Sequence, residues 1–133
     1  MKAILLVPML LFAVFFTGCS KDGDVVIPNR TILTTVRSAD WKLNPDNDNK
    51  SYSVTLDMPE IDGNVNQTHG ILVSVSADGT GFEAIPDVYN GFAFSYTHQP
   101  GSLTIETQSV EGTAGAPPGG DITVKIVIVV SQE

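Results

Sequence analysis

The chain has 133 residues, with 15 acidic and 7 basic side chains, so its formal net charge is −8 at pH 7. This length fits one domain rather than two. The negative charge would repel nucleic acid and anionic lipid head groups, and we therefore expect no nucleic-acid partner.

The first 18 residues have the pattern of a secretory signal peptide. A basic residue near the start precedes an apolar run at residues 3–16, and two small residues follow before Cys19. The apolar run is shorter than the ~20 residues that a membrane-spanning helix needs. We therefore expect residues 1–18 to be removed by cleavage between Gly18 and Cys19.

Cys19 is the only cysteine in the chain, and an exported protein with a single thiol cannot form an internal disulfide. The preceding residues give the sequence TGC, which resembles the lipobox of bacterial lipoproteins. Phe16 stands where that pattern usually has leucine. The resemblance implies that fatty acyl chains such as palmitate are attached at Cys19. Two or more such chains hold a protein stably on a bilayer, so the membrane is the expected partner.

The residues after Cys19 indicate where the protein is attached. Ser20 differs from the aspartate that retains lipoproteins in the inner membrane of enteric bacteria. A lysine followed by two acidic residues at 21–24 resembles the surface-export signal of Bacteroidetes lipoproteins, with a glycine between the two acids. This resemblance implies outer-membrane attachment and exposure on the cell surface. Residues 19–24 would then form a lipidated tether, and residues 25–133 a single domain.

The mature sequence predicts an all-β fold. Clusters of Gly, Pro, Asn and Asp separate short runs in which apolar and polar residues alternate, and the clearest run is SYSVTLDM at residues 51–58. Further candidate strands lie at residues 31–41, 70–78, 82–86, 91–98, 102–109 and 122–130, and residues 24–28 are expected to begin the domain. About seven short strands favour an immunoglobulin-like sandwich of two antiparallel sheets, with a small closed barrel as the alternative.

Two features of this pattern predict neighbours within the sheets. The turn QPG at residues 99–101 should join residues 91–98 and 102–109 as a hairpin. Residues 122–130 are apolar on one face throughout and on both faces toward their end, which predicts a central strand covered on both sides there.

The order of these segments resembles small Bacteroidetes outer-membrane lipoproteins of uncharacterised function. The shared features are a strand ending at Trp41, then YSVTLDMP, GILVSV and AIP, and finally KIVIV close to the end of the chain. Most of these residues are core positions. The resemblance therefore implies a location and a fold, and it implies little about activity.

The segment NPDNDNK at residues 44–50 is a weak candidate for a calcium site. Asn44, Asp46 and Asp48 alternate, and calcium prefers such oxygen ligands. The glycine and glutamate of an EF-hand loop are missing, and Asn, Asp and Pro are also ordinary residues of a solvated turn. We therefore expect no metal and no other cofactor.

The sequence contains no recognisable catalytic arrangement. It has no G-x-S-x-G motif, and its one thiol is assigned to lipidation. Asp57 and Glu60 could act on glycosides only if they faced each other across a cleft, which their spacing does not indicate. We therefore expect no enzymatic activity.

The remaining candidates for ligand contact are aromatic. Most aromatic residues fall on the inward face of a predicted strand, whereas Trp41 and Tyr89 lie beside turns. Exposed rings near polar groups can stack on sugar rings. The sequence thus favours a non-enzymatic, surface-anchored binding or structural module of the cell envelope. A glycan-binding accessory module, or a subunit that joins a larger surface complex through a sheet edge, remains open.

Overall fold

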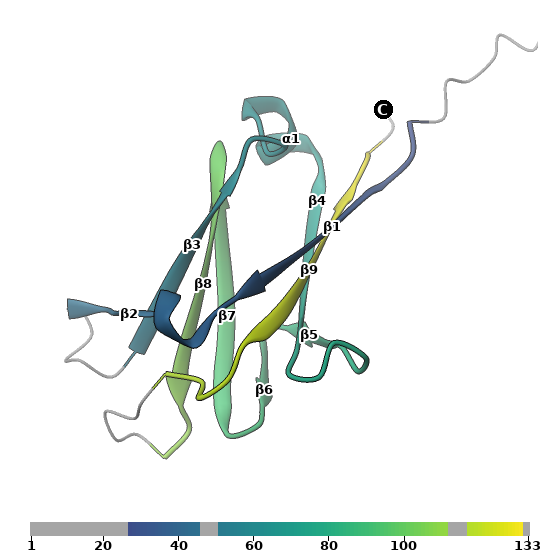
Figure 1. Ribbon diagram of the computed structural model, residues 1–133. Helices are drawn as coiled ribbons and strands as arrows, with labels where there is room; N and C mark the ends of the chain where they lie inside the picture. The colour runs from purple at the N-terminus through teal and green to yellow at the C-terminus, as the bar shows by residue number, and fades with distance from the viewer. Residues whose placement is uncertain (1–26, 46–50, 112–116, 132–133) are drawn as a thin grey trace, which may run out of the picture.

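The computed structural model describes residues 27–45, 51–111 and 117–131. In these residues the chain forms two antiparallel β-sheets packed face to face (Figure 1), which confirms the predicted sandwich. The strands are β1 (Arg30–Val36), β2 (Lys42–Leu43), β3 (Ser51–Met58), β4 (Gly70–Ser76), β5 (Glu83–Ile85), β6 (Asp87–Tyr89), β7 (Phe92–Gln99), β8 (Gly101–Ser109) and β9 (Ile122–Val129). A 3-10 helix, η1 (Ser38–Asp40), and an α-helix, α1 (Gly63–Thr68), complete the described elements.

The two sheets have the strand orders β1-β9-β4-β5 and β2-β3-β8-β7-β6. This arrangement matches an immunoglobulin-like sandwich if β3, β8 and β7 are taken as strands B, E and D, and β4 and β9 as C and F. The place beside strand F, which belongs to the last strand in immunoglobulin domains, is taken here by the first strand, β1. The place of strand A holds only the two residues of β2.

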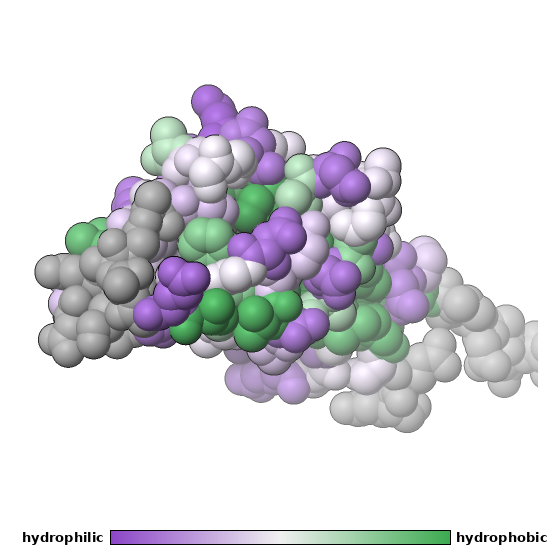
Figure 2. Space-filling view, turned by 90° about the horizontal axis from the view of Figure 1, so that it is seen from below, coloured by the Kyte–Doolittle hydropathy of each residue, from purple (hydrophilic) through white to green (hydrophobic). Residues whose placement is uncertain are grey.

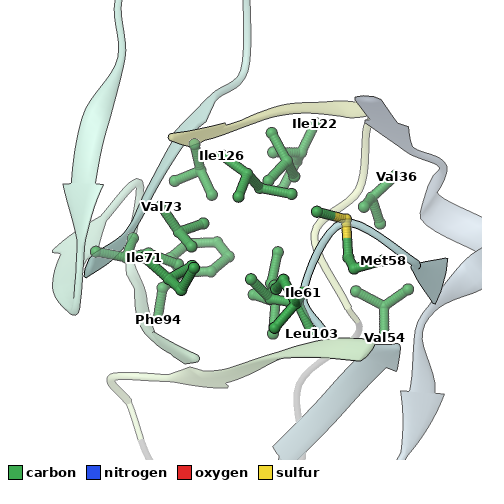
Figure 3. Packing of buried hydrophobic residues seen from close by; sticks show 14 of the residues in the cluster. Val36, Val54, Met58, Ile61, Ile71, Val73, Phe94, Leu103, Ile122 and Ile126 are labelled. Carbon is green, nitrogen blue, oxygen red and sulfur yellow. The ribbon is translucent and has the colours of Figure 1, made fainter. Parts of the chain in front are cut away.

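The hydrophobic core lies between the sheets because alternate residues of each strand point inward. In β9 the inward positions are all isoleucine or valine, and each of them is buried. Figure 3 shows these side chains meeting residues from β3, β4, β7 and β8 in the space between the sheets. Burial of such side chains stabilises a fold by about 1.5–3 kcal/mol each, which explains why the alternation in the sequence predicts the strands.

A hydrogen bond also links the two sheets through the core. The Tyr96 hydroxyl on β7 donates to the main-chain oxygen of Ile71 on β4, at 2.6 Å. Burial raises the pKa of Tyr96, because the charged phenolate would lose its solvation.

One end of the sandwich is closed by α1, which connects β3 to β4 (Figure 1). Asp62 caps the start of the helix, because its carboxylate accepts a hydrogen bond from the Val65 N–H at 2.8 Å. Ile61, just before the helix, is fully buried. The described chain enters and leaves at this same end, where the Val130 N–H donates to the Asn29 side chain. No helix within the described ranges is long and apolar enough to cross a bilayer.

The opposite end is formed by η1, the turn between β6 and β7, and the segment that leads into β9. The Ser38 hydroxyl donates to the main-chain oxygen of Pro118 at 3.0 Å, so η1 packs on that segment. Figure 2 looks onto this end and shows hydrophobic residues (green) mixed with hydrophilic ones (purple).

Several details differ from the sequence predictions. The described strands number nine rather than about seven, because the short strands β2 and β6 were not expected. The hairpin of β7 and β8 and the central position of β9 are confirmed.

The prediction that both faces of β9 are covered near its end is wrong. Val127 and Val129 on the outer face are half-buried, and the flanking Leu33 and Leu72 are 63% and 56% exposed. No described helix or second sheet covers this outer face. Its apolar side chains are therefore shielded from water only by the side chains beside them on neighbouring strands.

Candidate functional site

The residues of the predicted anchor and two of the three candidate metal ligands lie outside the described residues. These are Gly18 and Cys19, and Asp46 and Asp48. Lipidation, signal cleavage and calcium binding therefore stay predictions. Asn44 is described: its main-chain N–H donates to the oxygen of Ser51 at 2.8 Å, which extends the β2–β3 pairing by one residue. Among residues 27–45, 51–111 and 117–131 there is no cluster of three acidic, histidine or cysteine residues that could hold a metal.

The expected exposure of Trp41 is wrong. Its side chain is 7% exposed and belongs to the core, where its ring lies 6.4 Å from that of Phe94 between centroids. The reason is the 3-10 turn of η1, after which the chain places its largest apolar side chain between the sheets instead of beside a surface turn. Its indole nitrogen is buried without a hydrogen-bond partner.

Tyr89 is half-buried and lines a small cavity at the η1 end of the sandwich. Its hydroxyl oxygen accepts a hydrogen bond from the Ala77 N–H at 3.4 Å. The cavity has a volume of about 150 Å³, and its other lining residues are Ala77, Asn90, Phe92, Phe94, Pro118, Gly119, Gly120, Asp121 and Ile122. Trp41 is not among them, so the structure does not bring the two predicted aromatic residues together in one site.

A larger hollow lies beside strand β3. We call it the β3 edge groove; it has a volume of about 420 Å³ and is lined by Ala39, Asp40, Lys42, Ser53, Val54, Thr55 and Leu56. On one side β3 is paired with β8 along its whole length. On the other side β2 and Asn44 pair with residues 51–53 only, so residues 54–58 have no partner strand on this side, and residues 54–56 line the groove.

The pairing with β2 shows which main-chain groups face the groove. Because Asn44 donates to Ser51, the main-chain groups of Ser51 point toward β2. In antiparallel pairing, every second residue points its N–H and C=O to the same side, so Ser53, Thr55 and Asp57 do likewise. Within the described part of the chain no strand pairs with Thr55 or Asp57 on this side. Their four main-chain groups are therefore free to bond to an added strand.

The sandwich is also open between the sheets along this side. Ile32 of β1 and Leu56 of β3 point inward but stay half-buried, whereas Leu103 and Ile126 on the inner strands are fully buried. β1 and β3 are the strands that a complete strand A would cover in an immunoglobulin-like sandwich. The groove thus lies where this fold normally has another strand.

The groove lining contains one acid and one base, and a second acid lies farther along the same edge of β3. Asp40 is exposed, and its carboxylate accepts a hydrogen bond from the Arg37 N–H at 2.9 Å, which closes the η1 turn. Asp57 is exposed on β3 farther along the same edge. Lys42 is the one basic residue in the groove lining. Asp40 and Asp57 outnumber Lys42, so the local charge is negative, as is the net charge of the chain.

Sequence reasoning did not locate this groove, although β3 carries two signals of an edge strand. A charged residue on the outward face, Asp57, and a proline just after the strand, Pro59, both discourage uncontrolled pairing between edges. They indicate that part of β3 lies at an edge of its sheet, but they do not show which part β2 leaves uncovered.

In comparisons with protein-family models, curated proteins and solved structures, none matches this chain.

Proposed function

We propose that this protein is a lipid-anchored, non-enzymatic module of the cell envelope that holds an extended segment of a partner protein. The partner segment would add to β3 as a further strand of the sheet. The observation that supports this function is the unpaired edge at Thr55 and Asp57, next to a groove of about 420 Å³. The lipid anchor at Cys19 is supported by the sequence TGC at the end of an apolar leader.

Main-chain pairing alone would give weak binding. Two residues with free N–H and C=O groups allow up to four hydrogen bonds, each of which contributes about 0.5–1.5 kcal/mol net. Micromolar affinity corresponds to about 8 kcal/mol, and association also has an entropic cost. Side chains of the partner that enter the groove would therefore have to supply a large share of the binding free energy.

The anchor would orient the domain on the membrane. The described chain starts at Ile27, at the α1 end of the sandwich, and eight Cα–Cα steps separate Ile27 from Cys19. At about 3.5 Å per residue, these can span at most about 28 Å. The α1 end would then face the bilayer, and the η1 end with the Tyr89 cavity would face away from it.

Partner binding can be tested on intact cells with a photo-crosslinking residue at Ala39 in the groove wall. We expect one crosslinked protein adduct in the parent, and its loss in Thr55→Pro, which removes the N–H that faces the groove. Thr55→Val keeps the main chain and is the matched control. Equal adduct in all three proteins, or the same adduct from a crosslinker at Thr97 on the face of the sheet, would contradict strand addition.

The anchor is tested separately by mass spectrometry of the mature protein. The N-terminal peptide should begin at Cys19 and carry acyl chains, and Cys19→Ser should release the protein from the membrane fraction. A mature protein that retains residues 1–18, or carries an unmodified Cys19, would exclude lipidation.

The glycan-binding alternative has less support. It requires exposed aromatic rings, and of its two candidate residues Trp41 is buried and Tyr89 is half-buried in a cavity of about 150 Å³. The alternative of a subunit in a larger surface complex agrees with the proposal, since strand addition is one way to join such a complex.

A further inference from the structure

We infer that the partner segment is a short strand in which apolar and basic residues alternate, with the apolar side chains facing the groove and the basic ones facing outward. This inference rests on the proposed function, because it specifies which segment the β3 edge groove accepts. It follows from three features of the groove: its length, its pleat and its charge.

The length of the free edge limits the added strand to about five residues. β2 occupies the edge at Ser53, and Pro59 has no N–H with which to continue the pairing beyond Met58. The free part is therefore residues 54–58. Since every described ladder of both sheets is antiparallel, we take the added strand to be antiparallel to β3, continuing the direction of β2.

The pleat of β3 determines which side chains of the partner enter the groove. Partner residues that lie opposite Val54, Leu56 and Met58 would point inward as these three do, because paired residues of neighbouring strands point to the same side of a sheet. There they would meet the half-buried Leu56 and the opening between the sheets. Apolar side chains at these positions would complete the burial that a full strand A provides in immunoglobulin-like sandwiches.

Residues opposite Thr55 and Asp57 share the outward face, where the surroundings are acidic. Asp57 lies on the edge itself, and Asp40 lies at the groove. Glu106 is on the outward face of β8, opposite Ser53. The groove lining contains one basic residue, Lys42. Opposite charges on neighbouring strands stabilise a sheet and like charges destabilise it, so lysine or arginine fits these two positions.

The same charges disfavour a second copy of this chain as the occupant. Two β3 edges could pair only over residues 54–58, and each copy brings a net charge of −8 to the contact. A basic partner segment gains from this field, whereas a second copy is repelled by it. Self-association through β3 is therefore an outcome that the experiment must be able to detect.

Three synthetic heptapeptides probe the inference with the full-length protein. The first has Val-Lys-Val-Lys-Val between terminal threonines, the second has glutamate in place of lysine, and the third has the first peptide's composition with the alternation broken. The readout is hydrogen exchange at the amides of Thr55 and Asp57, with affinity measured by titration. We expect the lysine peptide to protect these two amides and to bind at least about tenfold more tightly than the glutamate peptide at low salt.

A pair of variants tests the charge at one position. Asp57→Asn should weaken binding of the lysine peptide by about 1.5- to 5-fold, as expected for one exposed charge pair, and the loss should shrink at high salt. Glu111→Gln removes one acid from the exposed segment after β8 and is the matched control, with no expected effect. Equal weakening by both variants would mean that only net charge matters, and would overturn the assignment of basic residues to the outward positions.

The outcomes separate this inference from the proposed function. Equal protection of Thr55 and Asp57 by all three peptides would overturn the inferred partner class and leave strand addition standing. No protection by any peptide would overturn strand addition itself. Protection that rises with protein concentration in the absence of peptide would identify a second copy as the occupant, and would also overturn the inference.

Discussion

Replacing Thr107 with valine should make the protein more stable. Thr107 lies near the end of β8 with 1% of its surface exposed, and its hydroxyl oxygen is buried without a hydrogen-bond partner. Its neighbours in the sheet are Tyr52 and Phe94, on the inward face. Valine has nearly the same shape and an equally high preference for strands, but it has no hydroxyl group.

The size of the effect follows from the lost hydroxyl. Burying such a group without a hydrogen bond costs about 1–3 kcal/mol by mutational measurements. Thr107→Val should therefore raise the free energy of unfolding by about 1–2 kcal/mol. In a domain of roughly 100 residues, each kcal/mol raises the melting temperature by about 4–8 °C.

Urea and thermal unfolding of the parent and the variant would measure this change. Thr104→Val is the matched control on the same strand, since Thr104 faces outward and shares a hydrogen bond of 2.9 Å with Thr55. We expect the control to change stability by no more than about 0.5 kcal/mol. A Thr107→Val variant that is less stable than the parent would refute the reasoning. Such a result would mean that the Thr107 hydroxyl of the parent has a hydrogen-bond partner, such as a buried water.

Three further predictions concern the core and the turns. Ile126→Ala, at a fully buried position of β9, should lower the free energy of unfolding by about 2–5 kcal/mol. Leu72→Ala, on the exposed face of β4, should change it by about 0.5 kcal/mol or less. Equal losses in urea unfolding would contradict the assignment of Ile126 to the core and Leu72 to the surface. A hydrogen bond from the Thr80 N–H lowers the pKa of Asp78 below its ordinary value of 3.8, so the charged carboxylate stabilises the fold above that pH and loses this contribution as the pH falls further. The stability deficit of Asp78→Asn should accordingly shrink below pH 3.8, and a deficit independent of pH would exclude this role. Tyr96→Phe should cost about 1 kcal/mol through the lost bond between the sheets, and absorbance titration of the parent should show a tyrosine that ionises above its usual value of 10.

The sequence predicted the strands well because their signal is local. In β3 and β9, alternation over eight residues is enough to assign both the strand and its inward face, since burial of one face is what the alternation reflects. The hairpin of β7 and β8 could be predicted equally well, because its turn QPG lies between two alternating runs.

The features that depend on distant parts of the chain were not predicted. Trp41 follows a turn, which suggested exposure, but it is buried because η1 directs it toward Phe94, more than fifty residues away. The short strands β2 and β6 exist only through their pairing with β3 and β7, and two or three residues carry no periodicity of their own. The β3 edge groove is likewise defined by where β2 stops.

The described strand β1 occupies the place that the last strand has in immunoglobulin domains, and this position affects how the chain folds. β9 lies between β1 and β4, so the first sheet lacks its central member until the final strand is available. Nearly the whole described chain separates Arg30 from Ile128, its partner across the ladder. Contacts between such remote segments form slowly, because a long loop must close before they are gained. The first sheet of a nascent polypeptide with this connectivity should therefore stay incomplete until β9 has been synthesised, which would keep β1 and β4 extended enough to pass through a translocation channel.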